Sequence, residues 1–159
     1  MQILRNFLSE DQLATVDYLL SESCWGFGFI SNDNTKPIWN FDKTQGKVIA
    51  DIVFSKIKGF ELVDYHINGQ TPLLNAAVHE DTDYGACTHT LVFFPYRWMY
   101  TWGGRLHIFL ENDMAIITPE KNLAVLFDAS RPHYAEAPTE TMLRVSIGLK
   151  LRKIENGQS

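Results

Sequence analysis

The chain has 159 residues, of which 45% are hydrophobic and 13% aromatic, and its formal net charge is −5 at pH 7. This length suits one domain that buries its own core, and the composition argues against a disordered chain. The acidic balance disfavours a nucleic-acid partner, because phosphate binding needs a basic face.

The sequence also argues against secretion and membrane insertion. The charged N-terminus lacks the apolar core of a signal peptide, and no apolar run approaches the ~18 residues of a membrane span. The two cysteines, Cys24 and Cys87, lie far apart and form no CxxC motif, so we interpret them as free thiols. We therefore expect a cytoplasmic protein with no membrane partner.

Two helices are predicted in the first third of the chain. The first covers residues 9–22, where Ser9 followed by Gln12 is the pattern of a capping box. The second covers residues 44–59, and Gly59 is expected to end it. The apolar stripes at helical spacing are Leu13, Val16, Leu19 and Leu20, then Val48, Ile49, Ile52, Val53 and Ile57.

The segment between the helices, with Trp25, Gly26, Gly28 and Trp39, is predicted to be a loop. After residue 59 the apolar period changes from 3.6 to 2, which is typical of strands. The first predicted strand ends at the turn signal Asn68-Gly69. The predicted strands are 61–67, 87–94, 104–110, 114–119, 122–128 and 143–151.

Helices followed by many short strands predict a mainly β fold with N-terminal helices. The expected architecture is an antiparallel sandwich or jelly-roll barrel, with the helices packed on one outer sheet. Barrels of this kind commonly bind ligands in their mouths, so candidate functional residues are sought there.

His79 and Asp81 are the first candidate site residues. On an extended segment, side chains two positions apart point to the same face. An imidazole and a carboxylate on one face are two thirds of the 2-His-1-carboxylate triad of non-haem Fe(II) sites. Because the pair alone is common by chance, a distant third ligand is needed, and His133 lies between two late strands from which it can reach the barrel mouth.

The other polar residues near this pair keep ordinary structural interpretations. Glu80 and Asp83 are expected to face solvent. The remaining histidines are interpreted as side chains on sheet faces: His66, His89 and His107.

The last predicted strand places an arginine inside the barrel. Leu143, Val145, Ile147 and Leu149 share one face and are expected to pack under the helices, so Arg144 and Ser146 point inward. A buried arginine is costly unless an anion faces it, and guanidinium groups bind carboxylates in a bidentate way. An internal salt bridge and a solvated barrel end remain alternatives.

In order along the chain, His79-x-Asp81, His133 and Arg144-x-Ser146 resemble the Fe(II)- and 2-oxoglutarate-dependent oxygenases. More narrowly, the chain resembles the prolyl 4-hydroxylase-like branch, including its short bacterial and phage-type members. The supporting residues are Asn-Gly-Gln-Thr at 68–71, Trp98, Trp-Gly-Gly at 102–104, the stretch 119–127 and Ala-Pro at 137–138.

The resemblance implies one oxygenase domain over 1–159. In it, residues 1–59 cap the barrel, 60–151 form a double-stranded β-helix of the jelly-roll, cupin-like type, and 152–159 form a tail. Fe(II) would be bound by His79, Asp81 and His133. The cosubstrate 2-oxoglutarate would be bound by Arg144, Ser146 and Tyr65, with Thr90 in place of a tyrosine that the family often carries. O2 is the further cosubstrate, and ascorbate is compatible with the class.

The activity that the resemblance implies is hydroxylation of an unactivated C–H bond, with succinate and CO2 as co-products. The substrate that this branch implies is a prolyl residue in a peptide or protein, and retention of Asp81 favours hydroxylation over halogenation. Candidate substrate-binding residues are Trp98, Tyr100, Trp102 and Arg105.

Three alternatives remain open at this point. One is a hydroxylase of a free amino acid or another small molecule. Another is a nucleic-acid demethylase, in which a second basic residue follows six positions after the arginine, where this chain has Lys150; the acidic charge argues against it. The last is a cupin-like binding protein without turnover.

Overall fold

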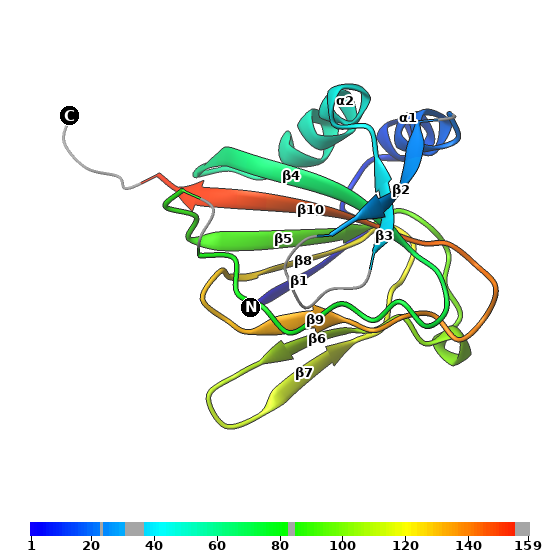
Figure 1. The fold of residues 1–159 in the computed structure, drawn as a ribbon. Helices are drawn as coiled ribbons and strands as arrows, with labels where there is room; N and C mark the ends of the chain where they lie inside the picture. Colours follow the sequence, from blue (N-terminus) through cyan, green and yellow to red (C-terminus); the bar gives the residue numbers. More distant parts are fainter. Residues whose placement is uncertain (23, 31–36, 83–84, 155–159) are drawn as a thin grey trace.

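The computed structural model describes residues 1–22, 24–30, 37–82 and 85–154 (Figure 1). The helices are α1 (Glu10–Leu20) and α2 (Lys43–Phe54), and a 3-10 turn covers Tyr100–Trp102. The strands are β1 (Gln2–Arg5), β2 (Trp25–Phe29), β3 (Ile38–Phe41), β4 (Phe60–Gln70), β5 (His89–Phe94), β6 (Leu106–Phe109), β7 (Met114–Ile117), β8 (Leu123–Asp128), β9 (His133–Ala135) and β10 (Arg144–Lys153).

Among the described residues, the strands form two antiparallel sheets. The large sheet has the order β1-β8-β5-β10-β4-β3-β2, and the small sheet has the order β7-β6-β9. Figure 1 shows α1 and α2 on the outer side of the large sheet and the small sheet on its other side. This arrangement confirms the mainly β fold with N-terminal helices, and two facing sheets are the layers of a double-stranded β-helix.

Helix α1 forms where the sequence predicts it. The Ser9 side chain accepts a hydrogen bond from the backbone of Gln12, whose side chain accepts one from the backbone of Ser9, so both halves of the capping box are present. Leu13, Val16 and Leu20 are buried against the large sheet, so the amphipathic stripe anchors the helix.

Helix α2 follows the cap residue Asp42 and covers Lys43–Phe54. Its C-terminal end therefore lies five residues before the predicted end at Gly59. Gly59 lies directly before β4 with a φ of 77°, so it belongs to the turn into the strand rather than to the helix end. Val48 is 54% exposed, so its assignment to the apolar stripe was wrong. The buried face consists of Gly46, Ile49, Ala50 and Val53.

The segment predicted as a loop between the helices forms the antiparallel strands β2 and β3 instead. Strand β1, which pairs with β8, was also not predicted. These strands have only 4 or 5 residues each, β1 and β3 carry no alternating apolar pattern, and β2 alternates its aromatic residues with glycines, which are depleted in strands. Strand formation here depends on pairing partners that are distant in sequence, which local propensity does not report.

The Asn68-Gly69 pair is not a turn, because β4 continues to Gln70. A Cβ atom on Gly69 would lie 2.7 Å from Cδ1 of Leu143 and 3.1 Å from Cζ3 of Trp25. The glycine is therefore required by close packing between strands and not by turn geometry. Continuation of β4 brings Gln70 opposite Arg144 on β10.

Strand β10 has the two faces that its alternation predicts. Val145, Ile147 and Leu149 are buried in the core that the large sheet forms with the helices. Arg144 and Ser146 are buried on the opposite face, which points toward the small sheet. A second apolar core fills the space between the sheets with Phe94, Leu106, Ile108, Ile117, Leu123, Val125 and Phe127. None of the helices in the described part of the chain is long and apolar enough to cross a membrane.

Candidate active site

A cavity of about 820 Å³ lies between the two sheets. Strands β4, β5 and β10 of the large sheet form one wall, and the segment 76–82 with β9 forms the other. The cavity is lined by six of the predicted site residues, which come from distant parts of the chain: His79, Asp81, Thr90, His133, Arg144 and Ser146.

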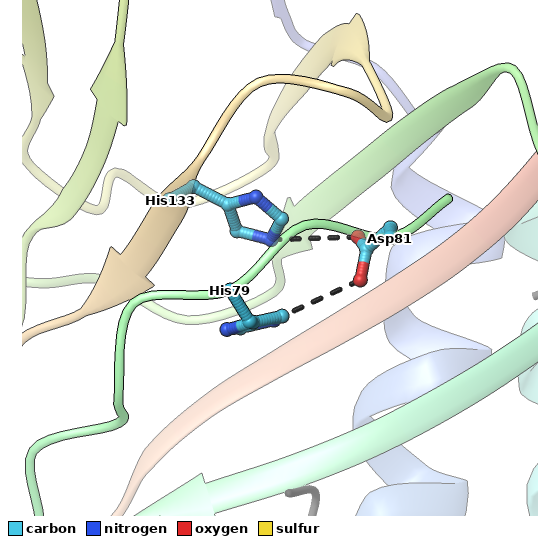
Figure 2. Close-up of side chains that lie close together, drawn as sticks. All are labelled: His79, Asp81 and His133. Carbon is cyan, nitrogen blue, oxygen red and sulfur yellow. Dashed lines mark ion pairs between the residues drawn. The ribbon is translucent and has the colours of Figure 1, made fainter. Parts of the chain in front are cut away.

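The three predicted metal ligands lie together in this cavity (Figure 2). Nε2 of His79 lies 3.7 Å from Oδ1 of Asp81, and Nε2 of His133 lies 3.4 Å from Oδ2 of the same carboxylate. One donor atom from each residue can be chosen so that all three lie within 4.8 Å of one another. These separations match a single ion bound between the side chains, since each metal–ligand bond is about 2.0–2.2 Å for first-row metals with N or O donors.

Backbone pairing sets the position of these ligands. His79 and His133 exchange two backbone hydrogen bonds, with N–O distances of 3.0 and 2.9 Å. The amide of Asp81 donates to the carbonyl of Ala129 at 2.9 Å. The His-x-Asp segment therefore extends the small sheet beside β9, and its extended conformation places both side chains on the cavity side as predicted.

Each histidine is oriented by a backbone carbonyl. Nδ1 of His79 lies 2.9 Å from the carbonyl oxygen of Ala77, and Nδ1 of His133 lies 2.9 Å from that of Arg131. Because a carbonyl only accepts, Nδ1 of each ring carries the proton, and the Nε2 lone pair faces the cavity. Burial lowers the pKa of His79, and the nearby His133 lowers it further, which favours the neutral form that a metal requires.

Asp81 is 1% exposed, and its two oxygens have different surroundings. Oδ2 accepts a hydrogen bond from the Thr90 hydroxyl at 2.6 Å and contacts Nζ of Lys150. Oδ1 is buried and has no hydrogen-bond partner among the described residues. Burial raises the pKa of this carboxyl, but His133 and Lys150 outweigh burial and hold it well below its ordinary value. A carboxylate with two imidazoles suits a divalent metal of the Fe(II) type.

Arg144 is 1% exposed and is fixed from several sides. Its Nε donates to the carbonyl of Gly104 at 2.6 Å, and its Nη1 donates to Oε1 of Gln70 at 2.9 Å and to Oγ of Ser146 at 3.3 Å. The ring of Phe94 lies 5.0 Å from the guanidinium carbon. Nη2 is buried without a hydrogen-bond partner in the described part of the chain.

Nη2 of Arg144 is therefore a buried cationic donor that is available to an anion. Burial lowers the pKa of Arg144 to about 10, and Glu136 partly offsets this effect, so the group stays protonated at neutral pH. An unpaired guanidinium nitrogen is costly in a buried place, and a carboxylate in the cavity would satisfy it.

The sequence prediction assigned no function to Gln70, which it named only within the supporting stretch 68–71, and none to Lys150 in the favoured oxygenase hypothesis. Gln70 pairs directly with Arg144 in the β4–β10 register, and Lys150 lies on the same face of β10 as Arg144 and Ser146. The alternation along the last strand already indicates that Lys150 shares the face of Arg144 and Ser146. The position of Gln70 could not be predicted, because a turn was expected at Asn68-Gly69 in place of the continuing strand.

The two remaining cosubstrate candidates lie elsewhere than expected. The Tyr65 hydroxyl donates to the carbonyl of Lys43 at the start of α2, so Tyr65 faces the helices and not the cavity. The next residue along β4, His66, points to the opposite face of the sheet and lines the cavity. Thr90 does line the cavity, but its hydroxyl donates to Asp81 and not to a group near Arg144.

The four predicted substrate-binding residues do not line this cavity: Trp98, Tyr100, Trp102 and Arg105. The Trp98 indole donates to the carbonyl of Gly103 at 2.9 Å and packs edge-on against Trp102. Tyr100 is 74% exposed. These contacts place Trp98 and Trp102 in the turn before Gly104, whose carbonyl accepts a hydrogen bond from Arg144. We therefore interpret their role as structural.

The other polar residues have mixed positions. His66 lines the cavity, whereas His89 packs against Phe60, and His107 stacks on Tyr134 with ring centroids 4.4 Å apart. Glu80 is exposed at the cavity rim. The expectation for Asp83 lies outside the described residues.

Sequence comparison finds neither a protein family nor a curated protein that matches the chain. Comparison of structures does find similar folds. An oxidoreductase of the 2OG-Fe(II) oxygenase family from Burkholderia pseudomallei has a TM-score of 0.74 at 10% identity, covering 98% of this chain and 88% of that one.

Two further similar structures differ in their described activities. A prolyl hydroxylase from Trichoplax adhaerens, in complex with a hypoxia inducible factor peptide fragment, has a TM-score of 0.67 at 16% identity, covering 96% of this chain and 83% of that one. The non-haem α-ketoglutarate-dependent epimerase SnoN from nogalamycin biosynthesis has a TM-score of 0.66 at 10% identity, covering 95% and 75%. These likenesses establish the double-stranded β-helix fold.

Proposed function

We propose that the chain is an Fe(II)- and 2-oxoglutarate-dependent oxygenase. The observation that carries the proposal is the presence of two complementary half-sites in one cavity. His79, Asp81 and His133 offer three metal donors, and the unpaired Nη2 of Arg144 offers a cationic donor for a carboxylate. A protein that binds a metal alone gains nothing from the second half-site, whereas a dicarboxylate that binds the metal and the arginine uses both.

The chain's own groups hold the reactants in this proposal. Nε2 of each histidine and a carboxylate oxygen of Asp81 would hold Fe(II), a donor set that leaves other coordination positions for the cosubstrates. Nη2 of Arg144 and the Ser146 hydroxyl bind the distal carboxylate of 2-oxoglutarate, while Gln70 and Gly104 keep the guanidinium aimed.

The bound metal with 2-oxoglutarate and O2 supplies the oxidation of an unactivated C–H bond, with succinate and CO2 as the co-products. The protein contributes orientation and exclusion of water, since Asp81, His133 and Arg144 are each less than 5% exposed. A cupin-like protein that binds a metal alone would leave the buried Arg144 donor unused, and one that binds a ligand without turnover is distinguished by the absence of succinate in the experiment below.

Within this class we propose a prolyl residue in a peptide or protein as the substrate. The support is the sequence resemblance to the prolyl 4-hydroxylase-like branch and the fold shared with a prolyl hydroxylase that binds a peptide. The second candidate is a small-molecule substrate, which the likeness to an epimerase from nogalamycin biosynthesis favours. The aromatic residues 98–102 lie outside the cavity, so they add no support to a proline-binding surface.

The deciding experiment supplies Fe(II), 2-oxoglutarate and air to the purified protein and measures succinate. We expect succinate with the native chain, and loss of at least ~100-fold with His79→Ala or Asp81→Ala, because each removes a metal ligand. Glu80→Gln is the matched control, since Glu80 lies between the two ligands but is exposed at the rim.

Undiminished succinate formation by Asp81→Ala would refute the assignment. The substrate class is tested in the same reaction by mass spectrometry for a gain of one oxygen. Proline-containing peptides and free proline are offered in parallel, and a product from free amino acids or other metabolites alone would replace the peptidyl proposal with the small-molecule one.

A further inference from the structure

Lys150 is a second buried cation in the cavity wall. It is 7% exposed, and it lies on the same face of β10 as Arg144. In the β5–β10 register it lies directly opposite Thr90, which is fully buried. Side chains directly opposite on one face of a sheet lie close together. Lys150 and Thr90 therefore reach the cavity as neighbours.

Both side chains converge on one atom. The Thr90 hydroxyl donates to Oδ2 of Asp81 at 2.6 Å, and Nζ of Lys150 contacts the same oxygen. The other oxygen, Oδ1, is buried without a hydrogen-bond partner among the described residues and faces Nε2 of His79 at 3.7 Å. Nε2 of His133 also lies 3.4 Å from Oδ2. Two side chains thus donate to Oδ2, whereas Oδ1 has no hydrogen-bond donor among the described residues.

We infer that Lys150 and Thr90 are positioning residues, which hold Oδ2 so that Asp81 binds the metal through Oδ1 alone. This inference rests on the proposed function, because it concerns the same metal. A carboxylate free to rotate could bind through both oxygens and take a coordination position that the cosubstrates need. Two donors on Oδ2 from a rigid strand pair prevent that rotation.

A buried lysine beside a metal also has an effect that opposes positioning. The direction in which metal affinity changes when Lys150 is removed therefore tests the inference. Its positive charge repels the metal, so a lysine without a positioning role would weaken metal binding by its presence. Positioning predicts that removal of Lys150 weakens binding. Simple repulsion predicts that removal of Lys150 tightens binding.

The experiment uses Co(II) as the probe with the full-length protein and without 2-oxoglutarate. Binding is measured by calorimetry, and the visible absorption of Co(II) reports the coordination number. We expect Lys150→Met and Thr90→Val each to weaken Co(II) binding by about tenfold, as loss of groups that orient metal ligands commonly does. The absorption bands should change with either variant, because the coordination by Asp81 changes.

The matched controls lie on the same two strands. Thr90→Ser retains the hydroxyl and should restore the native spectrum and affinity. Lys153→Met removes an exposed lysine from the end of β10 and should leave both unchanged. The double variant Thr90→Val with Lys150→Met should cost less than the product of the two single effects, because both act on one oxygen.

Three results would overturn the inference: tighter Co(II) binding by Lys150→Met, unchanged spectra in both variants, or strictly multiplicative effects in the double variant. If Lys150→Met does not fold, Thr90→Val with its serine control still decides the question. A native protein that binds no Co(II) would instead refute the proposed metal site, so the two failures are distinguishable.

Discussion

At the scale of single residues, the most informative side chain for the anion site is Gln70. Its Oε1 accepts from Nη1 of Arg144, and its Nε2 donates to the carbonyls of Leu74 and Ala135. The amide therefore fixes the guanidinium without neutralising it. A neutral acceptor leaves the full positive charge for a carboxylate in the cavity, whereas an anion at this position would compete with that carboxylate.

This contrast gives a prediction for Gln70→Glu. The new carboxylate would form an ion pair with Arg144 and repel 2-oxoglutarate, so the KM for 2-oxoglutarate should rise by at least ~10-fold. Gln70→Leu removes the hydrogen bonds without adding charge, so its KM should rise less. Steady-state kinetics with varied 2-oxoglutarate checks both, and equal KM values for the two variants would contradict the electrostatic explanation.

The residues of the site differ in how far the sequence could predict them. The proximity of His79, Asp81 and His133 was predicted from their order along the chain, which resembles that of an oxygenase family, and the structure places the three side chains in one cavity. Tyr65 could not be assigned, because one step along β4 moves a side chain from the cavity to the helices. Because the register of β4 was not known from the sequence, the face on which Tyr65 lies could not be predicted.

At the scale of elements, one asparagine joins the N-terminal segment to the large sheet. Asn122 precedes β8 with a φ of 62°, and its side chain accepts from the amide of Leu8 and donates to the carbonyl of Leu8, both at 2.8 Å. It is 9% exposed, so these bonds replace water at a buried backbone. Asparagine tolerates the left-handed region better than most residues.

We predict that Asn122→Ala lowers the free energy of unfolding by about 2–3 kcal/mol, since buried groups of Leu8 lose their partners and alanine is strained at positive φ. Urea unfolding measures the loss. Asn122→Gly is the paired variant, because it lacks the side chain but tolerates this φ, and it should be less destabilising by about 1 kcal/mol. A loss below about 0.5 kcal/mol in both variants would show that the link is unimportant.

Elements were predictable where the local pattern was strong. The capping box at Ser9 and the apolar stripe of α1 located that helix, and the alternation in β10 located both of its faces. Strands β2 and β3 were not predictable in this way, because β3 shows no alternation and the residues that alternate with the aromatic ones in β2 are glycines, which are depleted in strands. Their conformation depends on pairing with β4.

At the scale of the whole molecule, the proposed metal site connects distant parts of the chain. His79 and Asp81 lie on a segment beside the small sheet, while Thr90 and Lys150, which contact Asp81, belong to the large sheet. A metal bound there would hold the segment 79–81 to β9 and, through Asp81, to the large sheet. Binding to the folded state alone stabilises that state by mass action.

We therefore predict that Mn(II), at about 100 times its dissociation constant, stabilises the protein by about 2.7 kcal/mol. For a chain of this size, that corresponds to a rise in Tm of roughly 5–10 °C, measured by differential scanning calorimetry. Asp81→Ala should show no rise, and Glu80→Ala should show the full rise. An equal rise in Asp81→Ala would place the stabilising metal elsewhere.

The overall fold was predictable because the order of two helices and then many short strands excludes most alternatives, and the two-sheet architecture agrees with it. The position of the substrate was not predictable. The aromatic stretch at 98–102 had the composition of a binding surface, yet Trp98 packs behind Arg144, with Gly104 between them. Composition identifies a group that can stack on a ligand but not the face on which it lies.

The backbone pairing of His79 with His133 has a consequence for how such a protein can change over evolution. The spacing of the two imidazoles depends on one rung of a β-ladder, so the length of chain between Gln70 and Ala76 does not enter into it. Insertions or deletions in that connection would reshape the approach to the cavity while the metal geometry stays constant. In the proposed oxygenase, the entrance to the cavity could therefore vary among related chains while the metal ligands keep their spacing.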